Sequence, residues 1–270
     1  MSTEEFSRRG AIWLDALTRG APLLPGFPPS VRVVDASLHR QPARYIAVVP
    51  DANNLFTRAR SGEVGLREAW EVARAVREIV DADRTAEKRA IVAVIDVASQ
   101  AYGRLEEAYG IHQALAGAAD AYATARLAGH PVIGLIVGRA MSGAFLAHGY
   151  QANRLIALAD PQVMVHAMGK ASAARVTMRT VAELDALTAN VAPMAYDIES
   201  YASLGLLWKL MRVERADAPT GADVQAAVET LEAALADIRA DASRGLSGRL
   251  HSVNRAASLR VREKLRAQWQ

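Results

Sequence analysis

The chain has 270 residues, of which 51% are hydrophobic and 23% charged, values near those of an ordinary soluble globular protein. Disordered, collagen-like and coiled-coil classes are therefore disfavoured, and with 6% aromatic residues the core must be built mainly from Ala, Val, Leu and Ile. The absence of cysteine excludes disulfide scaffolds, cysteine nucleophiles, zinc ribbons and iron–sulfur clusters, and a net charge of +3 does not argue for nucleic acid as a partner.

Residues 1–30 are predicted to form an arm wrapped around the domain rather than part of its core. Trp13 and Leu17 have helical spacing, but four prolines follow between positions 22 and 29. Proline neither continues a helix nor joins a central strand. The first ten residues include acids and no apolar stretch of signal-peptide length, so neither secretion nor mitochondrial import is indicated. We therefore expect a cytoplasmic location.

The next elements predict the start of a sheet. Two short β-rich segments, Val31 to Asp35 and Arg44 to Val49, indicate a hairpin. A helix is expected from about Gly65 to Val80, because apolar residues including Trp70 recur on one face with a 3.6-residue period. The continuous run Ala90 to Val97, rich in β-branched residues, is typical of a strand buried on both faces of a parallel sheet.

Helices and strands then alternate, which is the pattern of an α/β protein with a mainly parallel sheet. No apolar run approaches the roughly 20 residues that span a membrane. Everything after Arg179 reads as helix, so the expected organisation is an arm at 1–30, a core at 31–178 and a helical C-terminal region at 179–270 in the same domain unit. The predicted elements of the later core are a helix at 106–127, a strand at 131–137, a short helix at 142–149, and strands at 154–159 and 162–166.

The segment from Arg244 to Gln270 is strongly basic, with seven Lys or Arg residues against one acid, Glu263. Aliphatic residues recur in it every three or four positions, which predicts an amphipathic helix. Three roles stay open at this point: a solvated face on a packed helix, docking onto an acidic partner subunit, or binding an anionic, phosphate-bearing ligand.

The strand-to-helix junction from Gly138 to Ala144 is the most informative place in the sequence. Small residues follow a buried strand here, and the first N–H groups of a helix have no partners within the helix. The junction can hold an oxyanion, or its small residues serve only close packing. A serine hydrolase is unsupported, because Ala140 and Ala144 stand where the nucleophile motif around Ser142 requires glycines. Neither a P-loop nor a G-x-G-x-x-G motif is present.

A second polar loop, Asp96 to Gly110, follows the preceding buried strand. Loops that follow the carboxyl ends of parallel strands are where ligands bind in α/β sheets. Two neighbouring strand ends can supply two backbone N–H donors to one oxygen, which is the geometry that stabilises an enolate.

These two loops resemble the carboxyltransferase branch of the crotonase superfamily. In that branch a D-x-P-G-x-x-x-G segment leads into a long helix, and a G-x-x-x-S-G-G-A segment opens the next. Ser142 and Gly143 match the S-G pair, and Ala144 replaces the second glycine. In the first segment Ser99 falls at the family's first glycine, with Gln100 after it, and Gly103 falls at the second. The resemblance covers about Val31 to Arg175 and implies a crotonase-like ββα spiral core with a helical C-terminal region.

The amino-acid sequences of the segments Asp51 to Gly65 and Val165 to Met168 are most similar to those of the gamma subunits of biotin-independent malonate decarboxylases. The resemblance implies that the backbone N–H groups of Ser142, Gly143, Ser99 and Gln100 form an oxyanion hole. His166 ends a strand near this place, so it is a candidate to bind a carboxylate or deliver a proton, or else a structural histidine. The implied substrate-binding residues are Tyr102, Gly103, Met141 and Ala144.

The resemblance also implies a heteromeric enzyme in which a homologous beta subunit binds the acyl-thioester arm and this chain completes the site. The substrate is then a malonyl thioester on the phosphoribosyl-dephospho-CoA arm of an acyl-carrier subunit, and an acyl-transferase alpha subunit is a further partner. No cofactor binds the chain directly, and no metal, nucleic acid or membrane is expected. Two alternatives remain: a carboxyltransferase alpha subunit of a biotin-dependent acyl-CoA carboxylase, and a non-catalytic scaffold subunit of the same fold.

Overall fold

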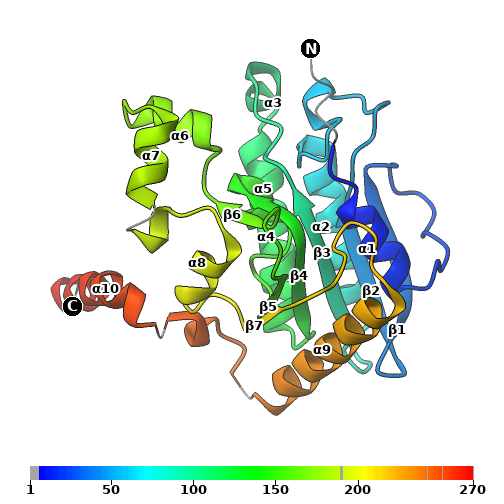
Figure 1. The fold of residues 1–270 in the computed structure, drawn as a ribbon. Helices are drawn as coiled ribbons and strands as arrows, with labels where there is room; N and C mark the ends of the chain where they lie inside the picture. Colours follow the sequence, from blue (N-terminus) through cyan, green and yellow to red (C-terminus); the bar gives the residue numbers. More distant parts are fainter. Residues whose placement is uncertain (1–5, 189–190, 242, 251, 270) are drawn as a thin grey trace.

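The computed structural model describes residues 6–188, 191–241, 243–250 and 252–269. Within them a seven-stranded sheet has the order β1-β2-β3-β4-β5-β7, and β6 pairs with the end of β4 (Figure 1). The strands are β1 (Val31–Leu38), β2 (Gln41–Val48), β3 (Ala90–Val97), β4 (Val132–Met141), β5 (Arg154–Leu158), β6 (Met164–His166) and β7 (Lys209–Met211). The α-helices are α1 (Arg9–Leu17), α2 (Leu66–Ala82), α3 (Arg104–Ala108), α4 (Ile111–Leu127), α5 (Ser142–Ala147), α6 (Lys170–Val176), α7 (Val181–Thr188), α8 (Ile198–Ser203), α9 (Gly221–Ala240) and α10 (Ala256–Gln268). Short 3₁₀ helices are Thr57–Ala59, Ala192–Met194, Ser247–Leu250 and Val253–Arg255.

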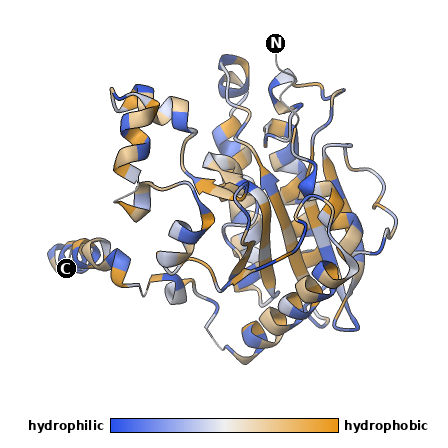
Figure 2. Cartoon of the chain, viewed as in Figure 1, coloured by the Kyte–Doolittle hydropathy of each residue, from blue (hydrophilic) through white to orange (hydrophobic). Residues whose placement is uncertain are grey.

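The sheet confirms the predicted hairpin and the predicted parallel core. β1 and β2 are antiparallel, whereas β2, β3, β4, β5 and β7 run parallel to one another. All eight residues of β3 are buried, because helices cover both faces of the sheet. α1 and α9 lie over one face and α2 and α4 over the other (Figure 1). In Figure 2 the central strands are the most apolar part of the chain.

The N-terminal segment is part of the core where α1 forms, which corrects the prediction of a peripheral arm. Trp13 and Leu14 are completely buried, and the Trp13 indole donates a hydrogen bond to the Ala216 carbonyl at 2.8 Å. The Asp96 carboxylate accepts from the Ser7 hydroxyl at 2.5 Å and from the Gly10 backbone N–H at 3.2 Å, so it anchors the start of α1. The proline-rich stretch after α1 lies largely at the surface, as predicted.

Two predicted helices differ in detail from those observed. The helix expected over 106–127 is divided into α3 and α4 at Gly110, whose φ of +79° lies in the left-handed region that favours glycine. In α2 the predicted boundaries are nearly right, but Trp70 is 47% exposed, and its ring lies against the surface of α4 at Gly117. The apolar period of α2 therefore marks its buried face without requiring that every residue in it be buried.

The C-terminal region is not all helical, because β7 adds a strand to the sheet beside β5. The basic terminal segment begins with irregular and 3₁₀ structure, so the α-helix predicted from Arg244 starts at Ala256 instead. No described residue of α10 is buried, and in Figures 1 and 2 this helix stands away from the sheet. None of the described helices is long and apolar enough to cross a membrane.

Candidate active site

The junction between β4 and α5 is sharper than the sequence indicates. β4 continues through Gly138 to Met141, and α5 starts at the next residue, Ser142. Ser142 has a φ of +57°, a left-handed conformation that is uncommon for any residue other than glycine. Such backbone strain is concentrated at functional sites, where the surrounding structure holds it. The turn directs the first N–H groups of α5 toward the loop that follows β3.

That loop brings Gln100 to Gly143, as the two-loop prediction requires. Val64 fixes the loop on its other side, since its N–H donates to the Ser99 carbonyl at 3.0 Å and its carbonyl accepts from Ala101 at 2.9 Å. The Gly143 backbone N–H donates to the side-chain oxygen of Gln100 at 2.8 Å. Gln100 is predicted to act through its backbone N–H, whereas the interaction that the structure shows with Gly143 is made by its side chain.

Gly143 is tightly surrounded. A Cβ atom placed on it would lie 3.3 Å from Gln100 Oε1 and 3.4 Å from Leu115 Cδ1, so even alanine needs its neighbours to yield slightly. Ala144 is completely buried in the main hydrophobic core, which leaves its methyl group for packing. Met141 is also buried, within a second cluster that includes Tyr196 and Leu184. These packed neighbours hold the Ser142–Gly143 turn in place.

A cavity of about 360 Å³ opens beside this turn. Ser142, Gly143 and His166 line it together with mainly apolar side chains. The arrangement follows from the sheet, because Met141 and His166 are directly paired in the register of β4 and β6. Tyr201 also lines the cavity, and its buried hydroxyl has no hydrogen-bond partner in the described structure. Burial raises the pKa of Tyr201, so this hydroxyl keeps its proton and is a donor.

His166 is held by Tyr196 and Met168. Its ring stacks on Tyr196 with 3.9 Å between ring centroids and 16° between planes, and Nδ1 lies 2.9 Å from the Met168 carbonyl oxygen and 3.1 Å from the Met168 nitrogen. Burial lowers the pKa of His166 below its ordinary value of 6.5, which favours the neutral ring. On the neutral ring, a proton on Nδ1 donates to the Met168 carbonyl and leaves Nε2 an acceptor, whereas a proton on Nε2 leaves Nδ1 to accept from the Met168 N–H. His166 thus lines the same cavity as the turn, and its tautomer decides whether Nε2 donates or accepts there.

Tyr102 and Gly103 lie at the start of α3, and neither is among the described residues that line this cavity. Tyr102 is exposed, and its hydroxyl donates to Glu107 at 3.0 Å. Gly103 fits tightly between Glu106 and Arg58, where a Cβ atom would lie 2.3 Å from the Glu106 carboxylate. The structure therefore brings Gln100 to Gly143 and places Ser142, Gly143 and His166 on one cavity, whereas Tyr102 and Gly103 are not among its described lining residues.

Sequence reasoning missed Tyr196 and Tyr201. Both belong to the region after Arg179, which was interpreted only as helix, and no motif or period distinguishes them there. The one feature that could have drawn attention to them is their residue type, since tyrosines are few in a chain with 6% aromatic residues.

Comparison with known proteins identifies the family. A family model described as malonate decarboxylase gamma subunit matches residues 59–269, more than three quarters of the chain. The chain belongs to the malonate decarboxylase gamma subunit family. The resemblance seen in the sequence is thereby confirmed.

Solved structures similar to this gamma subunit family member extend over nearly its whole length. A Pseudomonas malonate decarboxylase hetero-tetramer in complex with coenzyme A contains a chain that is 63% identical, with a TM-score of 0.92 over 97% of this chain and 99% of that one. A Pseudomonas MdcD–MdcE hetero-dimer contains a chain that is 62% identical, with a TM-score of 0.89 over the same shares. These relatives are subunits of hetero-complexes.

More distant relatives show the fold. The malonyl-S-ACP:biotin-protein carboxyltransferase MADD of Malonomonas rubra is 35% identical over 140 residues, which are 50% of this chain and 48% of that protein. This chain thus matches about half the length of that curated relative. A transcarboxylase 12S chain is 18% identical with a TM-score of 0.66 over 89% of this chain and 43% of that one, and confirms the predicted crotonase-like α/β fold.

Proposed function

We propose that this gamma subunit and a homologous beta subunit together form the site that decarboxylates a malonyl thioester. The thioester is carried on the phosphoribosyl-dephospho-CoA arm of an acyl-carrier subunit, and an acyl-transferase alpha subunit completes the assembly. Family membership supports the decarboxylase assignment, and the hetero-dimer and hetero-tetramer of the Pseudomonas relatives support shared work between subunits.

The observation that carries the proposal is the hydrogen bond from Gly143 N–H to Gln100 Oε1. A carboxamide oxygen is a carbonyl-type acceptor, as is the thioester oxygen of the substrate. The N–H group at the start of α5 is therefore positioned to bind such an oxygen, within reach of the loop that follows β3. The second donor of the proposed pair is a backbone N–H at Ser99 or Gln100.

The chemistry needs stabilised charge more than a nucleophile. Breaking the bond between the carboxylate carbon and the methylene carbon releases CO2 and leaves its electron pair on the acetyl thioester as an enolate. Fixed backbone donors that meet the enolate oxygen lower the barrier because they stabilise charge that develops in the transition state. His166 and Tyr201 line the same cavity. In the tautomer with the proton on Nε2, His166, like the Tyr201 hydroxyl, donates a hydrogen bond to the carboxylate or supplies the proton that the enolate finally takes up.

The family assignment favours this function over the biotin-dependent carboxyltransferase alternative. The relative from Malonomonas rubra is named for malonyl-S-ACP and for a biotin protein. For this chain we propose the first of these as substrate and no biotin carrier. Decarboxylation that is independent of any biotin protein separates the two functions.

The experiment compares Gly143→Val with Ser142→Ala in the assembled complex. Valine fills the space beside the donor, whereas Ser142→Ala leaves the backbone N–H in place. Loss of one such donor typically lowers kcat by about 100- to 1,000-fold. We expect that defect for Gly143→Val and a mild one for Ser142→Ala, with both complexes intact by gel filtration. An inactive Ser142→Ala beside an active Gly143→Val would make the hydroxyl the reacting group and refute the mechanism; two active variants would favour a scaffold role.

A further inference from the structure

Four arginines are buried in the described structure, and they fall into two classes. Arg9 and Arg44 each form ion pairs with two carboxylates. Arg126 and Arg249 donate only to carbonyl and amide oxygens, and within the described ranges neither has a carboxylate at ion-pair distance. Buried charges in proteins are normally paired, because transfer from water into the interior is costly. These two guanidinium groups therefore lack a counter-ion.

Arg249 shows the consequence most clearly. Its side chain enters from the C-terminal segment and donates to the Tyr150 carbonyl at 2.6 Å and to the Ala152 carbonyl. Burial lowers the pKa of Arg249 to about 10, and the positive charges of Arg126 and Arg154 act in the same direction. The pKa of Arg9, by contrast, is raised by its carboxylate partners. An anion at Arg249 would compensate a charge that the chain itself leaves unpaired.

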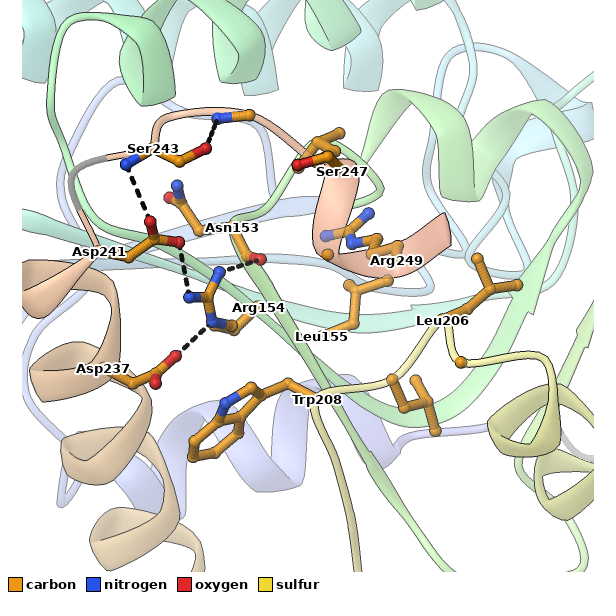
Figure 3. Close-up of a pocket in the computed structure, with 15 residues that line it drawn as sticks. Asn153, Arg154, Leu155, Leu206, Trp208, Asp237, Asp241, Ser243, Ser247 and Arg249 are labelled. Atoms are coloured by element: carbon orange, nitrogen blue, oxygen red, sulfur yellow. Dashed lines mark hydrogen bonds and ion pairs between the residues drawn. The ribbon is translucent and has the colours of Figure 1, made fainter. Parts of the chain in front are cut away.

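Arg249 lines a cavity of about 490 Å³ between the start of β5, α9 and the segment 243–249. Figure 3 shows Ser243 and Ser247 on one side of this cavity and Leu206 and Trp208 on the other. Two acids also line it, Asp237 and Asp241, and Arg154 binds both of them, which leaves one negative charge in that cluster. The positive charge of Arg249 lies apart from this cluster, next to serine hydroxyls that can donate, and opposite an apolar wall.

We propose that this cavity binds a small organic anion. Its phosphate or carboxylate group lies against Arg249 and Ser247, and its apolar part lies against Leu206 and Trp208. The lining residues sit at the amino ends of β5 and β7, whereas the candidate active site follows the carboxyl end of β4. The proposal is therefore independent of the proposed function. Leu206 lines both cavities, so a ligand in either cavity would contact the same side chain.

A small molecule fits this place better than a protein surface. Arg249 is 8% exposed and lines a cavity, so a small oxyanion fits against it better than a flat protein surface does. The basic segment 244–270 was open to either kind of acidic partner from sequence alone. In the structure the two halves of this segment differ, since the half with Arg249 faces a cavity and α10 faces outward.

The test is a thermal unfolding titration of the full chain with inorganic phosphate, acetate and phenyl phosphate. We expect a saturable rise in Tm, larger for phenyl phosphate because of its apolar ring. In Arg249→Met the dissociation constant for phenyl phosphate should rise at least tenfold, the order of magnitude expected for a lost charged hydrogen bond. It should stay unchanged in the matched control Arg212→Met, at an exposed arginine after β7. Phosphate and acetate distinguish the two anion chemistries. No saturable effect of any probe, or equal effects in Arg249→Met, would overturn the proposal.

A second variant guards against a general folding defect in Arg249→Met. Ser247→Asp places a carboxylate in the cavity beside Arg249. We expect it to raise Tm without ligand and to abolish the phenyl phosphate response. An unchanged response would show that the probe binds elsewhere. Stabilisation that needs the beta subunit and not the probes would assign the missing charge to a partner carboxylate and overturn the small-molecule site.

Discussion

The side-chain oxygen of Gln100 lies 2.8 Å from the backbone nitrogen of Gly143 and accepts its hydrogen bond. The two residues belong to different loops, one after β3 and one at the start of α5. This hydrogen bond occupies the Gly143 N–H, the donor that the proposed mechanism assigns to the substrate oxygen. A substrate oxygen must therefore replace the Gln100 carboxamide before it can use this donor.

Gln100→Ala removes this competitor. A single hydrogen bond contributes about 0.5–1.5 kcal/mol net, which corresponds to a two- to tenfold change in affinity. We expect KM for the malonyl thioester to fall by about that factor in the assembled complex, with a matching rise in kcat/KM. The control is Gln113→Ala on the exposed face of α4, which should leave both constants unchanged. A lower kcat/KM in Gln100→Ala would show that the carboxamide itself binds substrate.

Stability should fall as the pH drops from about 6.5 to 4. His148 is completely buried; Nε2 donates to the Val94 carbonyl at 3.1 Å, and Nδ1 accepts from the Tyr122 hydroxyl at 3.1 Å. Burial lowers the pKa of His148 to about 4. Below pH 6.5 the unfolded chain binds a proton that the folded chain excludes, so the free energy of unfolding decreases, by roughly 3 kcal/mol at pH 4.

Urea unfolding at several pH values checks this dependence. His148→Gln should be less stable than the parent at pH 7 but should lose less stability on acidification. The exposed His112 provides the control, since His112→Gln should retain the parental slope. An unaltered slope in His148→Gln would assign the acid sensitivity to other groups.

Asp96→Asn should destabilise the fold by about 1–3 kcal/mol, the usual cost of disturbing a buried charged acceptor. Besides Ser7 and Gly10, its carboxylate accepts from the Arg139 backbone N–H at 3.1 Å. The negative charge also stands at the N-terminus of α1, where it is favourable. Chemical denaturation measures the loss, with the exposed Asp120→Asn as control. Equal stability of the two variants would contradict the anchoring role of Asp96.

Removal of residues 256–270 should weaken assembly while leaving the fold intact. The described part of α10 contributes no buried residue, and its charged side chains are four basic residues and Glu263. Such a surface chiefly accelerates association with an acidic partner, so we expect slower, salt-dependent binding of the beta subunit. Binding kinetics at two ionic strengths provide the measurement. A longer truncation that removes residues 247–270 provides a comparison, because it also removes Arg249 and should lower Tm. Unchanged binding in the shorter truncation would exclude α10 from the interface.

The strands that could be predicted are those with a composition of their own. β3 was predicted with its boundaries because Ala90–Val97 is a continuous apolar run, and such runs are typical of central parallel strands. β7 has three residues, too few for any period to show, and it becomes a strand only because β5 offers an open edge. Gly110 divides α3 from α4 while the apolar period continues across it, so periodicity alone gave one helix.

The candidate site was predictable in its backbone and not in its side chains. The resemblance placed the loop at Gln100 beside the turn at Gly143, and the structure brings them together. Whether Gln100 turns toward α5 depends on its tertiary contact with the Gly143 N–H, which no spacing in the sequence encodes. Tyr196 follows the 3₁₀ helix Ala192–Met194 and stacks on His166, in a region interpreted only as helix.

The contacts of α1 have a consequence for the order in which the protein is made. Trp13 and Arg9 find their partners at Ala216 and Asp217, more than 200 positions later in the chain. On the ribosome the first helix therefore emerges long before these two partners exist. Arg9 can pair with Asp160 once that residue is made, but the Trp13 indole has to wait for Ala216. Closure of the core over α1 is thus a late step of biosynthesis, and a chain that stops before Ala216 would lack the acceptor for the indole.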